Sequence, residues 1–154
     1  MSLDIDEKQG FKARQKHIHD HWGFHCTCNH CSLSQSQQTL SDQRISKMID
    51  LRTRLLGFSS EGHDNESREM ALELIELYRE EKLHAVMAEA YMLAALRFCA
   101  WNDEEKTKEL AKLALDNWLV WEKKGEGNRE MLGHVAASPK DSWCWNLGRN
   151  LEAT

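Results

Sequence analysis

Hydrophobic positions recur at intervals of three and four along most of the chain after residue 39, which places them on one face of an α-helix. The first such stretch spans 39–56, with Gly57 as the terminator, and the residues that fall at this spacing are Ile45, Met48, Ile49, Arg52 and Leu56. After a polar loop, a second helix is expected to begin at Asn65 or Ser67, both good N-cap residues. Its apolar face comprises Met70, Ala71, Leu74, Ile75 and Tyr78.

The stretch 84–101, HAVMAEAYMLAALRFCAW, is dense in alanine and large apolar residues, and it predicts the most buried helix. Asn102 and Asp103 then form a turn and an N-cap, and two glutamates follow in the first helical turn. This helix is expected to end at Lys123, Lys124 and Gly125. The residues that it is expected to bury are Leu110, Leu113, Ala114, Asn117 or Trp118, and Trp121.

A short helix over 128–137 is expected to end before Pro139, and Trp143 and Trp145 are expected to plug the end of the helical array. No segment alternates with a period of two, so no strand is predicted. The sequence therefore predicts an all-α fold of antiparallel helical hairpins. The pair of helices around Asn102 resembles a tetratricopeptide unit, although the repeat's spacing is only partly met.

The first 35 residues differ in character from the rest. A polar helix is expected over 4–21, and Trp22 and Gly23 break it just before a cysteine-rich loop. The stretch 32–43, SLSQSQQTLSDQ, is rich in serine and glutamine and is expected to be a linker. We therefore expect a small cysteine-rich segment over 1–35 and a helical domain over 36–154.

Composition narrows the class of protein. Hydrophobic residues make up 41% of the chain, which is enough for a core, and no apolar run approaches the roughly 20 residues of a membrane span. The net charge of −5 disfavours direct binding to nucleic acid. The polar, acidic start of the chain has no signal-peptide pattern, so we expect an intracellular protein, in the nucleus or the cytoplasm.

Three of the 5 cysteines, Cys26, Cys28 and Cys31, form a C-x-C-x-x-C cluster. Short spacing lets three thiolates converge on one ion, and a structural zinc site uses sulfur ligands in a tetrahedron of four. We favour zinc over a redox dithiol, an iron–sulfur cluster or an unmetallated, partly oxidised loop. Cys99 and Cys144 lie among apolar residues and are expected to act as buried small hydrophobes.

The sequence leaves the fourth zinc ligand open. Histidines lie inside the cluster and just before it, and the two distant cysteines or another chain could also donate. Two of these histidines are four residues apart and would share a helix face, as metal-binding pairs do, although solvated surface groups have the same spacing. The candidates within the chain are His17, His19, His21, His25, His30, Cys99 and Cys144.

The run 13–34, ARQKHIHDHWGFHCTCNHCSLS, resembles the segment that closes SET-domain protein-lysine methyltransferases, especially the SMYD-like group common in fungi. In that group Arg-Gln-Lys precedes an aromatic-Gly-Phe-x-Cys-x-Cys-x-x-Cys pattern. Here RQK lies at 14–16 and WGFHCTCNHC at 22–31. The stretch 111–145 is also similar to the family's C-terminal helical region, so the resemblance covers most of the chain.

The resemblance implies that Cys26, Cys28 and Cys31 bind a structural zinc together with one cysteine of the SET domain. It also implies that Phe24 contacts the adenine of S-adenosylmethionine. The helical region would cover the catalytic domain and help to shape the cleft for a protein or peptide substrate, such as a histone or another lysine-containing protein.

The sequence departs from the family because the SET motifs and the tyrosine of the methyl-transfer channel are absent, and Tyr78 and Tyr91 are expected to be core residues. We therefore expect a C-terminal fragment of such an enzyme, inactive alone, binding zinc weakly and S-adenosylmethionine not at all. Two other hypotheses stay open: a free-standing helical protein-interaction module with vestigial cysteines, and a small zinc protein with a histidine as the fourth ligand.

Overall fold

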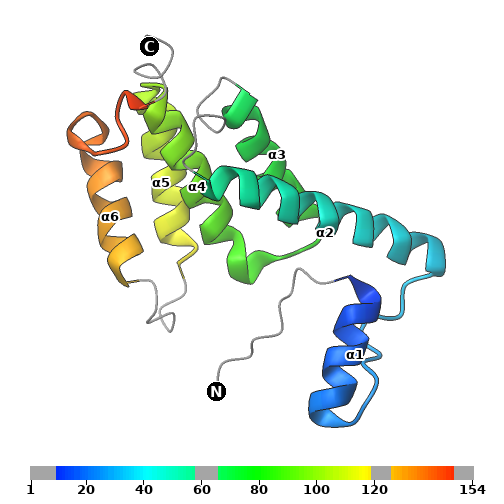
Figure 1. Ribbon diagram of the computed structural model, residues 1–154. Helices are drawn as coiled ribbons and strands as arrows, with labels where there is room; N and C mark the ends of the chain where they lie inside the picture. The colour runs from blue at the N-terminus through cyan, green and yellow to red at the C-terminus, as the bar shows by residue number, and fades with distance from the viewer. Residues whose placement is uncertain (1–9, 58–65, 119–125, 148–154) are drawn as a thin grey trace. The chain divides into compact units, whose positions relative to one another are not determined.

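The computed structural model describes residues 10–57, 66–118 and 126–147, and every regular element in these ranges is helical, which confirms the all-α prediction. The chain divides into two compact units, 1–50 and 51–154. The elements are the α-helices α1 (Phe11–Trp22), α2 (Gln35–Leu56), α3 (Glu66–Glu80), α4 (Met87–Ala100), α5 (Glu104–Asp116) and α6 (Glu126–Ala137), and the short 3-10 helices His84–Val86 and Pro139–Asp141 (Figure 1).

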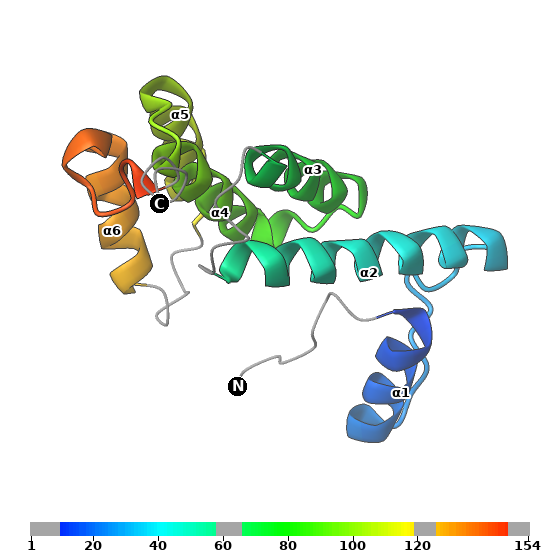
Figure 2. The same cartoon turned by 45° about the horizontal axis from the view of Figure 1, so that its top comes forward.

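In the first unit, the connection between α1 and α2 runs back alongside α1 (Figures 1 and 2). The N-terminus of α1 is held by α2, because Asp42 Oδ1 accepts a hydrogen bond of 2.7 Å from the Phe11 backbone N–H. A β-carbon at Gly10 would lie 3.3 Å from the Asp42 carboxylate, so the absence of a side chain there permits this close approach. Arg14 and Ile18 are the buried residues of α1.

The predicted linker over 32–43 is wrong, because α2 begins at Gln35. Ser34 and Gln37 form a reciprocal cap at its start. The Gln37 backbone N–H donates to Ser34 Oγ at 3.4 Å, and the Ser34 backbone N–H donates to Gln37 Oε1 at 3.3 Å. The helix predicted over 4–21 begins at Phe11 in the described part of the chain, and residues 4–9 lie outside that part.

In the second unit, α3 packs on α4, α4 on α5 and α5 on α6 (Figure 1). The prediction that α4 is the most buried helix is confirmed, since 11 of its 14 residues are buried. Five of these are alanines, whose small side chains let neighbouring helices approach closely. The predicted apolar face of α3 is buried as expected, including Tyr78, which is fully buried.

In the second unit, the cap of α3 and the burial of three aromatic residues differ from the predictions. Ser67 lies within α3 rather than at its cap, and Asn65 lies outside the described residues. Tyr91 is half-buried rather than in the core. Trp143 is 54% exposed and does not plug the helical array, while Trp145 is half-buried.

The helix after the turn is shorter than predicted. It ends at Asp116 instead of near Gly125, since the Asn117 side-chain amide bonds the Leu113 carbonyl oxygen at 2.8 Å and takes part in closing the last turn. Leu110 and Ala114 are buried as predicted, whereas Leu113, Asn117 and Trp118 are half-buried. Trp121 and the predicted stop at 123–125 lie outside the described residues.

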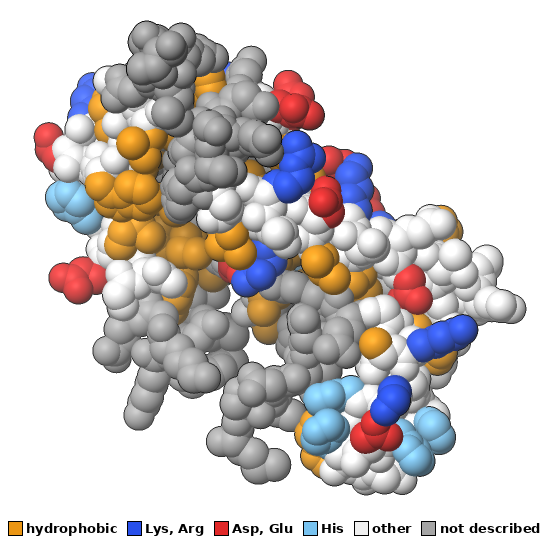
Figure 3. Space-filling view, in the orientation of Figure 1, with side chains coloured by type: hydrophobic (Ala, Val, Ile, Leu, Met, Phe, Trp, Pro, Cys, Tyr) orange, Lys and Arg blue, Asp and Glu red, His pale blue; other side chains and the backbone are white. Residues whose placement is uncertain are grey.

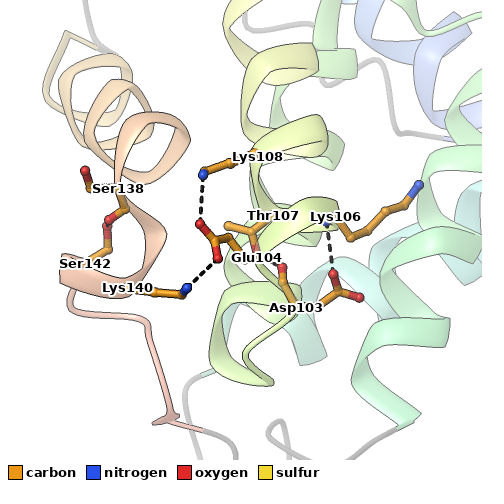
Figure 4. A network of polar contacts seen from close by, with 8 residues as sticks. All are labelled: Asp103, Glu104, Lys106, Thr107, Lys108, Ser138, Lys140 and Ser142. Carbon is orange, nitrogen blue, oxygen red and sulfur yellow. Dashed lines mark hydrogen bonds and ion pairs between the residues drawn. The ribbon is translucent and has the colours of Figure 1, made fainter.

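The start of α5 carries the predicted cap. Asp103 Oδ1 accepts a hydrogen bond of 3.0 Å from the Lys106 backbone N–H. Beside it, Glu104 lies between two lysines, Lys108 at 2.8 Å and Lys140 at 2.7 Å (Figure 4). Lys140 belongs to the segment after α6, so the ion pair between Glu104 and Lys140 joins the start of α5 to that segment. None of the helices in the described ranges has the length and apolar character needed to cross a membrane.

Candidate metal centre

The cysteine cluster forms a compact group of three sulfur atoms. The Sγ atoms of Cys26, Cys28 and Cys31 all lie within 4.8 Å of one another. Cys28 is exposed, and Cys26 and Cys31 are half-buried, so the group is accessible to solvent. Within the described residues, no other three His, Cys, Asp or Glu side chains converge in this way.

Gly23, whose backbone is in the left-handed conformation, turns the chain toward the cysteine loop. Gly23 ends α1 with a φ of 73°, a conformation that glycine adopts without the steric cost of a side chain, and its N–H bonds the His19 carbonyl oxygen at 2.8 Å. The chain can then run back along α1. Gln15, two turns earlier, uses both ends of its side-chain amide to hold Cys26.

The Gln15 contact is reciprocal. Its Nε2 donates to the Cys26 carbonyl oxygen at 2.8 Å, and its Oε1 accepts from the Cys26 backbone N–H at 3.0 Å. The far end of the cluster is held from α2, where Gln38 Nε2 donates to the Cys31 carbonyl oxygen at 3.2 Å. Within the loop, the Ser32 backbone N–H donates a hydrogen bond of 2.9 Å to the Cys28 carbonyl oxygen and so forms a turn. Both helices of the unit therefore fix the cysteine loop.

Two of the thiols, Cys28 and Cys31, differ in acidity. Burial is the main cause that raises the pKa of Cys31 to about 11, and hydrogen bonds with Cys28 and Cys26 add to the effect. The pKa of Cys28 is lowered, chiefly by a hydrogen bond from the Cys31 backbone and also by the neighbouring thiols. The loop therefore stabilises the thiolate form of Cys28, the form that binds metals.

None of the nearby histidines joins the three sulfurs within the 4.8 Å that unites them. His17 and His21 do share a face of α1, as predicted, but their rings stack with centroids 4.1 Å apart. His19 and His25 stack at 4.8 Å. The Nε2 atom of His30 lies 3.4 Å from Ser41 Oγ. Figure 3 shows histidine side chains gathered on the surface of this first unit.

The two remaining cysteines were predicted to be buried small hydrophobes. Both are fully buried, but they are not separate thiols, because Cys99 and Cys144 form a disulfide with a Cα–Cα distance of 5.6 Å. The bond joins α4 to the segment after α6. Since their sulfurs are bonded to each other, they are not available as metal ligands.

Phe24, the predicted cofactor-contacting residue, lies between Gly23 and the first cysteine and is 54% exposed. Trp22, at the end of α1, is also exposed. The structure thus presents two large apolar side chains next to the cysteine loop.

The two residues that position the cluster, Gln15 and Gln38, were not predicted from the sequence. Gln15 appeared in the Arg-Gln-Lys pattern, but its role could not be assigned from the pattern alone. The signal that could have found Gln38 is the capping box at Ser34 and Gln37, because it extends α2 back to the cysteines.

The donor set suits zinc. Zinc–sulfur bonds of about 2.3 Å place tetrahedral sulfurs about 3.8 Å apart, so the three Sγ atoms need to close by no more than about 1 Å. Three thiolates would occupy three of the four positions, and no fourth His, Cys, Asp or Glu atom of the described residues lies within the same 4.8 Å group. Comparisons of the chain with protein-family models, with curated proteins and with solved structures give no match.

Proposed function

We propose that the chain supplies the zinc-binding closing segment and the C-terminal helical domain of a SET-domain protein-lysine methyltransferase. The observation that carries the proposal is the group of three cysteine sulfurs, Cys26, Cys28 and Cys31, within 4.8 Å of one another and without a fourth described donor. An incomplete tetrahedron of this kind is what a segment needs if it closes onto a second domain. The residue pattern around it supports the same assignment.

In this proposal the SET core donates the fourth sulfur, and Phe24 covers the adenine of S-adenosylmethionine. Its exposure supports this role, because an aromatic ring in solvent is available to stack against a ligand or partner. The chemistry of methyl transfer belongs to the core. That core binds the sulfonium and aligns a neutral lysine amine of a protein substrate, such as a histone.

The second unit would act as a repeat-like, tetratricopeptide-like domain that covers the catalytic core. The serial packing of α3, α4, α5 and α6, each on the next, supports this reading. The alanines of α4 allow the close helix packing that such arrays require. This chain would be inactive alone and would contribute to the substrate cleft of the complete enzyme.

The experiment pairs the chain with a SET core of the SMYD-like group produced without its own closing segment. Zinc affinity is measured with a competing chelator, and S-adenosylmethionine binding by calorimetry, for each protein alone and for the mixture. The proposal predicts weak, exchangeable zinc in the chain alone, and tighter zinc with cofactor binding in the mixture. A chain that retains one zinc against a strong chelator by itself would contradict it.

The control replaces Cys26, Cys28 and Cys31 together by serine. This variant should lose the gain in zinc affinity and the cofactor binding in the mixture. Equal cofactor binding by the mixture with and without the cysteines would also contradict the proposal.

A further inference from the structure

We propose that the three cysteines of the first unit form a receptor for trivalent arsenic, taken up as arsenous acid. The inference needs only the three-sulfur geometry and not the proposed role in a methyltransferase. Arsenic(III) is thiophilic and binds three thiolates as a pyramid, with its lone pair in the place that a fourth ligand would take. A site with three sulfurs and no fourth described donor is therefore complete for this element, although it is incomplete for zinc.

The geometry favours binding of all three sulfurs to one atom. The Sγ atoms already lie within 4.8 Å of one another. After the first arsenic–sulfur bond forms, the other two thiols are held close by, so the later steps are effectively intramolecular. Gln15 and Gln38 hold the loop at its two ends, at Cys26 and Cys31, so little chain entropy remains to be lost on closure.

The site is also accessible to a small neutral acid. Cys28 is exposed, and the other two cysteines are half-buried, so no helix has to open before arsenous acid reaches the first sulfur. The three thiols of the cluster are the chain's only reduced cysteines, because Cys99 and Cys144 are joined to each other. Arsenic uptake therefore reports on this cluster alone.

The reaction balances without an oxidant. One molecule of arsenous acid reacts with three thiols to give one arsenic trithiolate and three molecules of water. Three arsenic–oxygen bonds and three sulfur–hydrogen bonds break, while three arsenic–sulfur bonds form. Each thiol proton leaves with a hydroxide, and arsenic stays trivalent.

The test incubates the full chain with sodium arsenite and measures its mass in the native state, together with a count of reactive thiols. The expected result is one arsenic per chain, a mass gain of one arsenic less three hydrogens, and the loss of all three reactive thiols. Each single variant, Cys26→Ser, Cys28→Ser and Cys31→Ser, should bind arsenite at least tenfold more weakly.

Phenylarsine oxide serves as the control probe, because its arsenic is satisfied by two thiols. It should bind the wild-type chain and still bind each single variant, which shows that the remaining thiols are accessible even where a variant is less stable. The inference is overturned if arsenite leaves the three thiols reactive, or if a single serine leaves arsenite affinity unchanged. Zinc binding is measured in a separate experiment. A failure to bind zinc as proposed would not change the arsenite result, and a failure to bind arsenite would not change the zinc result.

Discussion

A few side chains outside the cysteine motif decide how the motif is presented. Gln15 is the clearest case, because its amide bonds both the N–H and the carbonyl oxygen of Cys26, much as a neighbouring strand would. Partners of metal-binding residues tune affinity by fixing ligand orientation. The acidity of the cluster is also set locally, since burial raises the pKa of Cys31 while a backbone N–H lowers that of Cys28.

Replacing Gln15 by alanine should release Cys26 and lower zinc affinity by about tenfold, the lower end of the range for residues that support metal ligands. Competition with a chromophoric chelator measures this affinity. The matched control is Gln43→Ala, an exposed glutamine of α2, which should bind zinc like the wild type. Equal affinities for both variants would show that the amide contact does not position the ligand.

At the scale of single elements, the helices depend on different kinds of interaction. The helix α4 is buried along most of its length, and Ala95 within it is fully buried. The helix α5 depends more on its N-terminus, where Asp103 caps the backbone and Glu104 lies between Lys108 and Lys140. Negative charge in the first turn also suits the helix dipole.

Replacing Ala95 by glutamate should lower the free energy of unfolding by several kcal/mol, roughly 3–5, because a carboxylate would be forced into a packed site without a partner. Urea unfolding followed by far-ultraviolet circular dichroism measures the change. The control Ala137→Glu adds the same charge at an exposed position at the end of α6 and should stay within about 0.5 kcal/mol of the wild type. A loss of similar size in both variants would contradict tight packing around α4.

The Glu104 ion pair predicts a pH dependence of stability. Hydrogen bonding and charge from Lys108, and then Lys140, lower the pKa of Glu104 from 4.5 to about 2. Because the folded-state pKa is depressed, the stabilisation is fully present above pH 4.5 and is lost as the pH falls toward 2. The difference in Tm between the wild type and Glu104→Gln should therefore be constant near neutral pH and shrink through this acid range.

Glu105→Gln is the control for that experiment, since it removes one negative charge from the same first turn of α5 at an exposed position. Its effect on Tm should be smaller at neutral pH than that of Glu104→Gln. If the Glu104→Gln difference were to grow on acidification, the sign of the assigned linkage would be wrong.

Sequence periodicity predicted the helices that bury an apolar face, and α3 and α4 lie where the pattern placed them. It failed where polar residues start or stop a helix. The serines and glutamines before residue 39 suggested a linker, yet Ser34 and Gln37 cap each other and start α2 there. The candidate site was also predicted only in part. The motif showed the three cysteines, whereas the positioning role of Gln15 can be seen only in the folded structure.

At the scale of the whole molecule, the chain consists of two units with different means of stabilisation. The first unit is small and is held together by side-chain contacts to backbone, such as Asp42 to Phe11. The second has a packed helical core and a disulfide between residues 45 positions apart. The pairing of Cys99 with Cys144 could not be predicted from the sequence, because it depends on the way α5 and α6 return the chain to α4.

Removing the disulfide should destabilise the second unit. The double variant Cys99→Ala/Cys144→Ala is expected to lose about 2–4 kcal/mol, because the bond restricts the unfolded chain over a long loop. Thermal unfolding with and without a reductant measures the effect. Reductant should lower the Tm of the wild type and leave that of the double variant unchanged; an unchanged wild-type Tm after complete reduction would contradict the stabilising role.

X-ray absorption spectroscopy at the zinc edge, on the chain loaded with one zinc, counts the ligands of the bound ion. It tests most directly whether Cys26, Cys28 and Cys31 share one ion whose fourth donor comes from outside the described side chains. We expect the zinc to have three sulfur ligands and one oxygen ligand from solvent. A shell of four ligands all supplied by this chain, or one with fewer than three sulfurs, would contradict this expectation.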